Sequence, residues 1–292
     1  MSTTIGEALR DAIRRLTQAQ TPEPRAAAEV LLADLLSVPR WQLHFDQQRV
    51  LGASLYAGYV ERIARRQGGE PVQYITGRQE FWSLDFDVSS DVLIPRPESE
   101  QLVAHGVRLA RRWRALHPQQ PLHVLDVGTG SGNLAVSLAR ELAQSCVWGV
   151  DCSFDALRVA RRNAQRLGVA AQTRWVCGDL SSPLRTPTQR FALCVSNLPY
   201  VTIDEWRQLP REIRDYEPPG ALLGGHDGLD LIRCLIAASP AILAAGGSLL
   251  LEVGWQQAAS VLDIMQQNGL FHCMGVYHDL AGIERVVWAQ MP

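Results

Sequence analysis

The segment Asp126-Val127-Gly128-Thr129-Gly130-Ser131-Gly132-Asn133 decides the fold of this 292-residue chain. A short apolar run at 123–127 precedes the glycines, and a helical pattern at 133–142 follows them. Glycines at alternate positions let the backbone turn sharply and approach a ligand closely. Such a strand-to-helix turn is typical of the ligand-binding end of a parallel sheet. A glycine-rich loop alone is weak evidence for a nucleotide, because a plain turn can have the same composition.

Strand and helix patterns alternate along the chain after Pro121. Strands are predicted at 123–127, 146–150, 174–177, 191–195, 247–253 and 286–289, and helices at 133–142 and 154–167. This alternation predicts an α/β fold with a doubly wound, mostly parallel sheet.

The amino-terminal part has a different pattern. Apolar residues recur at three- and four-residue steps in the first 36 residues, and a further helix is predicted from Leu55 to Arg66. Alternating apolar and aromatic residues at 81–88 predict a β-hairpin. We therefore predict a helical domain at 1–70, a hairpin linker at 71–95 and an α/β domain at 96–292.

Composition favours a cytoplasmic protein that binds neither nucleic acid directly nor a membrane. The net charge is −2, and the 28 basic residues are all arginines scattered along the chain. The pI of about 6.4 is unlike that of a typical nucleic-acid binder. No apolar run approaches the roughly 20 residues that cross a bilayer, and the first residues lack the apolar core of a signal peptide. The six cysteines show no CxxC spacing, which predicts buried free thiols and no metal site.

Acidic residues follow the next two predicted strands. Asp151 ends the second strand, where a carboxylate can accept hydrogen bonds from ribose hydroxyls. Asp179 and Leu180 follow the third strand and could hold an adenine between a polar group and an apolar wall. The missing Walker lysine weakens an ATPase or kinase interpretation, whereas the loop alone does not exclude a dehydrogenase.

The glycine loop with these two acids resembles the S-adenosylmethionine site of class I methyltransferases. The resemblance implies that Gly128, Gly130 and Gly132 pass the methionine part of the cofactor and that Asp151 holds the ribose. The full set of implied cofactor-binding residues is Gly128, Thr129, Gly130, Ser131, Gly132, Asp151, Asp179, Leu180 and Asn197.

The fourth predicted strand runs into Asn197-Leu198-Pro199-Tyr200, which resembles the N/D-P-P-Y signature of methyltransferases that act on exocyclic amines or amide nitrogens. Such a nitrogen attacks poorly because its lone pair is delocalised. Acceptors at its two hydrogens would favour a pyramidal geometry, and the Asn197 side-chain oxygen and the Leu198 carbonyl can supply them. Tyr200 offers a flat face for a planar group. The resemblance implies Asn197, Pro199 and Tyr200 as catalytic residues and 197–200 as the substrate-binding segment.

Leu198 departs from this signature, because proline is usual at its position. Its carbonyl remains, and Pro199 still holds the preceding residue near extended conformations. The fixed φ angle of a proline is lost, and an additional N–H needs a partner. We therefore expect the role to be kept and the rigidity of the loop to change.

Further segments resemble the release factor glutamine methyltransferases (the HemK/PrmC family) along nearly the whole chain. They are GEPVQYITG at 69–77, EF at 80–81, VLIPRPESE at 92–100, YEP at 216–218, AL at 221–222, GGHDGL at 224–229 and LEVG at 251–254. The resemblance implies a seven-stranded methyltransferase sheet. It also implies N5-methylation of the glutamine in the Gly-Gly-Gln loop of class I peptide chain release factors, with the helical domain and the hairpin gripping this protein substrate.

Several alternatives remain open. A sister group that methylates a glutamine of a ribosomal protein usually has P-R-S where this chain has P-R-P at 95–97, which favours release factors. A nucleic-acid adenine methyltransferase would need a basic, aromatic recognition region, and a binding module would have lost catalysis. Arg96 and Glu98 either line an entrance between the domains or form an ion pair at a helix start. Glu217 and Asp227 either contact the substrate or stabilise loops.

Overall fold

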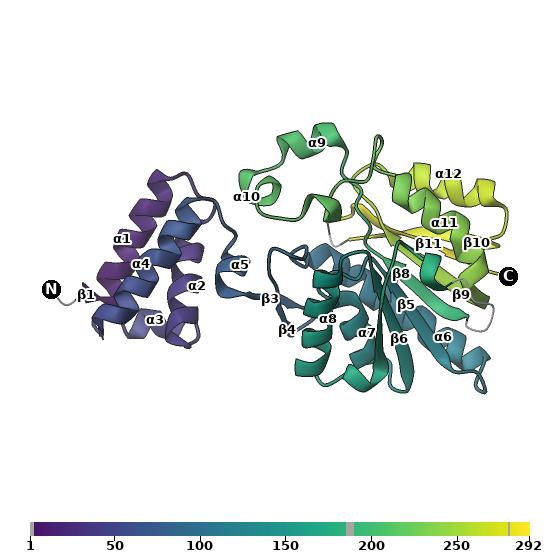
Figure 1. The fold of residues 1–292 in the computed structure, drawn as a ribbon, viewed down its shortest axis with the longest axis horizontal. Helices are drawn as coiled ribbons and strands as arrows, with labels where there is room; N and C mark the ends of the chain where they lie inside the picture. The colour runs from purple at the N-terminus through teal and green to yellow at the C-terminus, as the bar shows by residue number, and fades with distance from the viewer. Residues whose placement is uncertain (1–2, 185–189, 280) are drawn as a thin grey trace. The chain divides into compact units, whose positions relative to one another are not determined.

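The computed structural model describes residues 3–184, 190–279 and 281–292. The chain forms two compact units (Figure 1). Unit 1 consists of residues 1–78 and 210–216, and unit 2 consists of residues 79–209 and 217–292. Among the described residues, no helix is both long enough and apolar enough to cross a membrane.

Unit 1 is the predicted helical bundle. Its three long helices are α1 (Ile5–Gln18), α2 (Pro24–Leu36) and α4 (Ala53–Gln67), which pack against one another around a buried apolar core. Helix α1 begins at Thr4, where Thr4 and Glu7 form a reciprocal capping box. The shorter elements are β1 (Thr3–Thr4), β2 (Val50–Leu51), α3 (Gln42–Phe45) and α5 (Val72–Thr76).

A segment from the second half of the chain also belongs to unit 1. Helix α10 (Arg211–Arg214) lies in this segment, and Glu212 pairs with the buried Arg66 at 2.7 Å. The Tyr216 hydroxyl donates to the carbonyl of Gly68 at 3.0 Å. These contacts are between residues about 150 positions apart, and no local pattern in the sequence predicts them.

Unit 2 contains a seven-stranded sheet in the order β10-β11-β9-β8-β5-β6-β7. Strands β5 to β9 are parallel to one another, and β11 and β10 are antiparallel at one edge, so the predicted doubly wound, mostly parallel sheet is confirmed. The strands are β5 (Leu122–Val127), β6 (Ser145–Asp151), β7 (Thr173–Cys177), β8 (Phe191–Ser196), β9 (Leu243–Glu252), β10 (Cys273–His278) and β11 (Glu284–Gln290). Strand β10 is missing from the sequence-based prediction.

Helices cover both faces of this sheet because its central strand is apolar on both sides. In β5, Leu122 and Val124 belong to one apolar core, whereas Leu125 and Val127 belong to the other. The first core also takes residues of α6 (Glu100–Leu116), α7 (Asn133–Glu141) and α8 (Phe154–Arg166). The second takes residues of α11 (Asp230–Ile242) and α12 (Ala258–Asn268).

Two further expectations can be compared with the structure. The predicted hairpin is present as β3 (Arg78–Phe81) paired with β4 (Leu84–Asp87). The cysteines are free as predicted, but burial was predicted wrongly for most of them, since only Cys194 is buried. Cys152 and Cys177 are exposed because they lie where β6 and β7 leave the apolar core.

Asn163 on α8 connects the hairpin with the glycine loop. Its side-chain oxygen accepts from the backbone N–H of Asp87 at 2.7 Å. Its amide group donates to the carbonyl of Asp87 at 3.0 Å and to the carbonyl of Ser131 at 2.9 Å. The residue is fully buried, so each of these bonds satisfies a backbone group that water does not reach.

We predict that Asn163→Asp lowers the free energy of unfolding by about 3 kcal/mol, because a buried carboxylate would face two carbonyl oxygens that have lost their donor. Gln165→Glu is the matched control, since Gln165 lies exposed on the same helix and undergoes the same chemical change. Urea unfolding followed by circular dichroism measures both. Equal stability of the two variants would contradict the connecting role of Asn163.

Candidate active site

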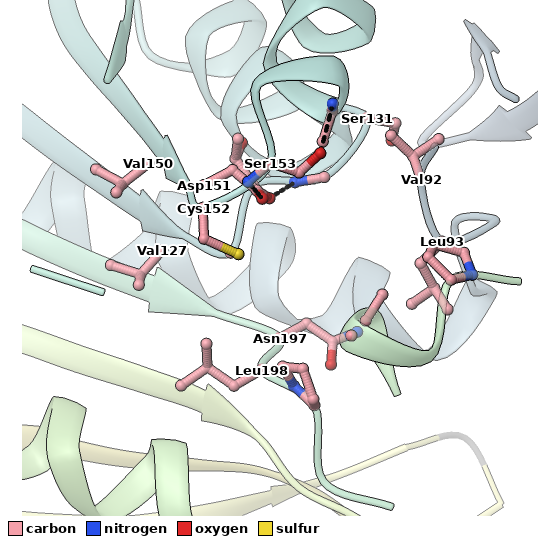
Figure 2. A pocket seen from close by; sticks show the side chains of 18 of the residues that line it. Val92, Leu93, Val127, Ser131, Val150, Asp151, Cys152, Ser153, Asn197 and Leu198 are labelled. Atoms are coloured by element: carbon pink, nitrogen blue, oxygen red, sulfur yellow. Dashed lines mark hydrogen bonds between the residues drawn. The ribbon is translucent and has the colours of Figure 1, made fainter. Parts of the chain in front are cut away.

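The parallel register brings the carboxyl-terminal ends of three strands, β5, β6 and β8, to the same end of the sheet. Val127, the last residue of β5, lies beside Val150 of β6 and Ser196 of β8. The segments that follow these strands therefore meet around one cavity of about 270 Å³ (Figure 2). Figure 2 shows Asp151 and Asn197 on this edge, with Val92 and Leu93 approaching from another segment.

The glycine loop has the backbone that its sequence predicts. Gly128, Gly130 and Gly132 have φ angles of 73°, 53° and 78°, a region that favours glycine. A Cβ atom on Gly130 would meet nothing within 4 Å, whereas one on Gly132 would lie 3.0 Å from the Cβ of Ala160. Gly130 therefore leaves space toward the cavity, and Gly132 permits close packing of α7 against α8.

The buried Asp126 stabilises the glycine loop through two hydrogen bonds. Asp126 accepts from the Thr129 hydroxyl at 2.6 Å and from the backbone N–H of Ala135 at 3.1 Å. Burial raises the pKa of the Asp126 carboxyl to about 7, against the effect of these two hydrogen bonds. Asp126 was not among the predicted site residues, although it opens the quoted glycine segment.

Asp151 presents its carboxylate at the carboxyl end of β6. One oxygen accepts from the backbone N–H of Gly130 and the other from that of Ser153, both at 2.8 Å. Figure 2 shows these two bonds as dashed lines. A carboxylate has about four acceptor positions, so two remain for a pair of hydroxyl groups.

Asn197 lies directly after β8 and lines the cavity. Its amide group donates to the hydroxyl of Ser99 at 3.0 Å. Leu198 is buried, and its side chain lies under Gly128, where an added Cβ would come within 3.3 Å of it. The side chain that replaces the usual proline thus packs into the apolar core.

Tyr200 is placed differently from the other residues of the predicted motif. It is absent from the residues that line the cavity. Its hydroxyl lies 3.5 Å from the carboxylate of Glu252, and burial raises its pKa far above the ordinary value. The ring packs against the core that contains α11 and α12.

Three further polar residues singled out in the sequence, Arg96, Glu217 and Asp227, stabilise loops. The buried Glu217 accepts from Arg96 at 2.5 Å and from the backbone N–H of Ile94 at 3.2 Å. Arg96 thus pairs with a distant glutamate, and it also lines the cavity. Asp227 pairs with Arg233 and accepts from the backbone of Leu229.

The cavity brings together most of the predicted site residues. All of them line it except Gly132 and Tyr200. The prediction missed several other residues of the cavity. Some of these lie in the family-like segments at 92–100 and 216–218, where only Arg96, Glu98 and Glu217 had been considered for an entrance or a substrate contact. The missed residues include Val92, Leu93, Pro95, Ser99, Ser153, Pro218 and Ala221.

These residues fit S-adenosylmethionine. The open side of Gly130 leaves room for an extended chain beside the backbone. Asp151 offers acceptors for two ribose hydroxyls, and Asp179 with Leu180 borders the same cavity. Among the described residues, no group of three His, Cys, Asp or Glu side chains could hold a metal ion.

Comparison with known proteins identifies the family. A model described as the PrmC N-terminal domain matches residues 7–77, and a methyltransferase domain matches residues 124–220. The hMettl16 catalytic domain is 12% identical with a TM-score of 0.52, covering 83% of this chain and 84% of its own, which shows a shared fold alone.

Curated relatives are much more similar. A release factor glutamine methyltransferase of Koribacter versatilis is 42% identical over 289 residues and 99% of both chains. Another, of Moorella thermoacetica, is 38% identical over 97% of this chain and 96% of its own. The chain therefore belongs to the release factor glutamine methyltransferase family.

Proposed function

We propose that this protein transfers a methyl group from S-adenosylmethionine to the side-chain nitrogen of the glutamine in the Gly-Gly-Gln loop of class I peptide chain release factors. The observation that carries the proposal is a single cavity that joins the glycine loop and Asp151 to the Asn197 segment. The names of the relatives support release factors as substrates. The hMettl16 catalytic domain was solved in complex with an RNA hairpin, but it shares only the fold with this chain and so does not bear on the substrate.

The residues of the chain position the reacting groups. S-adenosylmethionine supplies an electrophilic methyl group on a positively charged sulfur. The Asn197 side-chain oxygen and the Leu198 carbonyl accept the two hydrogens of the glutamine amide, so that its lone pair points at the methyl carbon. With S-adenosylmethionine bound, attack by the amide nitrogen would form the N–C bond while the donor's S–C bond breaks to give a neutral thioether, and the methylated nitrogen would then lose one proton to water.

We assign the cofactor to the side of the cavity formed by β5, β6 and β7. Asp151 holds the ribose hydroxyls, and the loop from Gly128 to Gly132 lies beside the methionine part of the cofactor. Asp179 and Leu180 border the adenine. We assign substrate recognition to the helical unit and the hairpin. A protein that modifies release factors would act in the cytoplasm.

Labelled methyl transfer tests the proposal against its rivals. The acceptors are purified release factor, its Gln→Ala loop variant, ribosomal protein L3 and DNA. We expect label on the release factor and none on the Gln→Ala variant. Label on ribosomal protein L3 alone, on DNA alone or on no acceptor would contradict the assignment.

We predict that Asn197→Ala lowers kcat for release factor methylation by about 100- to 1000-fold, since an acceptor aimed at the reacting nitrogen is lost. The dissociation constant for S-adenosylmethionine, measured by calorimetry, should stay within about threefold. Asn268→Ala, at the end of α12 and outside the cavity lining, is the control. Near-normal turnover of Asn197→Ala would remove this residue from the mechanism.

We predict that Asp151→Asn raises the dissociation constant for S-adenosylmethionine by about 10- to 100-fold, because hydrogen bonds to a charged acceptor are lost. At saturating cofactor, kcat should fall much less. Asp155→Asn is the matched control, since Asp155 pairs with exposed Arg158 and lies outside the cavity lining. Unchanged cofactor affinity in Asp151→Asn would contradict the ribose assignment.

A further inference from the structure

The Asn197 side chain is held by residues that lie far from it in the sequence. Ser99, at the start of α6, accepts from the Asn197 amide group at 3.0 Å. The same Ser99 hydroxyl donates to the carboxylate of Glu252, the last residue of β9, at 2.5 Å. Ser99 and Glu252 are almost fully buried, at 1% and 2% exposure, so water does not compete for these bonds.

The number of hydrogens available fixes which group donates in each of these two hydrogen bonds. A serine hydroxyl has one hydrogen, and when Glu252 is ionised the Ser99 hydrogen goes to its carboxylate. Ser99 can then only accept from Asn197, so the NH₂ group of Asn197 must face Ser99. The Asn197 oxygen is left on the opposite side of the amide. Without a fixed donor and acceptor, the amide could turn over and present its NH₂ group to the substrate.

Ser99 is the last residue of a short 3-10 helix (Pro97–Ser99) that runs directly into α6. Its side chain makes no capping bond to the backbone of α6. The hydroxyl instead forms hydrogen bonds with both Asn197 and Glu252. Ser99 also lines the cavity.

We propose that Ser99 and Glu252 are positioning residues that lock the Asn197 amide with its oxygen toward the substrate nitrogen. The inference deepens the proposed function and rests on it. It gives a role to Ser99 and Glu252, which belong to the family-like segments 92–100 and 251–254 and have no part in the mechanism proposed above. The Tyr200 hydroxyl, 3.5 Å from the other oxygen of Glu252, belongs to the same network.

The first test removes the hydroxyl. Ser99→Ala should lower kcat for methyl transfer to release factor by about 10- to 100-fold, while the dissociation constant for S-adenosylmethionine stays within about threefold. Ser99→Thr keeps a hydroxyl and should restore most of the rate. Ser137→Ala is the control, because Ser137 is also fully buried but its hydroxyl has no hydrogen-bond partner.

The second test separates orientation from stability. Burial raises the pKa of Glu252 to about 7, so this carboxylate contributes least to stability above that pH, where it is ionised. At pH 8, Glu252→Leu relieves a buried charge but leaves the Ser99 and Tyr200 hydroxyls without their acceptor, so its Tm should stay within about 5 °C of the wild-type value. Its kcat should nevertheless fall about 10- to 100-fold, because Ser99 becomes free to donate to the Asn197 oxygen. Glu252→Gln keeps an acceptor for Ser99 and should retain most of the rate.

Wild-type kcat in both Ser99→Ala and Glu252→Leu would overturn the positioning role, as would equal losses in Ser99→Ala and Ser137→Ala. A loss of kcat in Glu252→Leu that only follows a lower Tm would also overturn it. These outcomes differ from failure of the proposed function, in which the wild-type protein itself transfers no methyl group to release factor.

Discussion

The parallel pairing of β5 with β6 on one side and β8 on the other is the constraint on which the site depends. In a parallel sheet the carboxyl ends of all strands lie at one edge. The glycine loop, Asp151 and Asn197 each follow one of these three strands, so the register alone brings them to one cavity. The two apolar cores that cover the sheet keep the register in place, because a shift by one residue would exchange the side chains that pack in the two cores.

The elements that could be predicted from the sequence are those with a strong local pattern. The three long helices of unit 1 and the central strands follow from apolar periodicity. Strand β10 was missed because it lies at the edge of the sheet, where its residues 274–277 are only half-buried and lack a clear alternation. The return of residues 210–216 to the helical unit was missed because it depends on distant contacts such as Arg66 with Glu212.

The site residues likewise divide into those that a local sequence pattern reveals and those that depend on distant contacts. Gly128 to Ser131, Asp151 and Asn197 could be found because each directly follows a predictable strand. Ser99 and Glu252 could not be connected with Asn197, because Ser99 lies 98 residues before Asn197 and 153 residues before Glu252. Tyr200 was expected to face the planar substrate group, but it lies outside the cavity lining with its hydroxyl near Glu252. Local sequence cannot show which side of a strand-end loop becomes buried.

Leu198 shows how the chain accommodates its departure from the family signature. The carbonyl that the proposed mechanism uses belongs to the backbone and is kept with any residue. The leucine side chain is buried under Gly128 and joins the apolar core, which offers a different means of holding the loop. The substitution is therefore compatible with an intact acceptor pair at Asn197 and Leu198.

In the proposed reaction two oxygens, the Asn197 side-chain oxygen and the Leu198 carbonyl, receive the hydrogens of the substrate amide. The most direct measurement is a crystal structure of the protein with S-adenosylhomocysteine and a peptide containing Gly-Gly-Gln. We predict that the glutamine nitrogen lies within hydrogen-bond distance, about 2.7–3.2 Å, of both oxygens, with the Asn197 NH₂ group still on Ser99. A glutamine bound through its carbonyl to the Asn197 NH₂ group, or held outside this cavity, would contradict it.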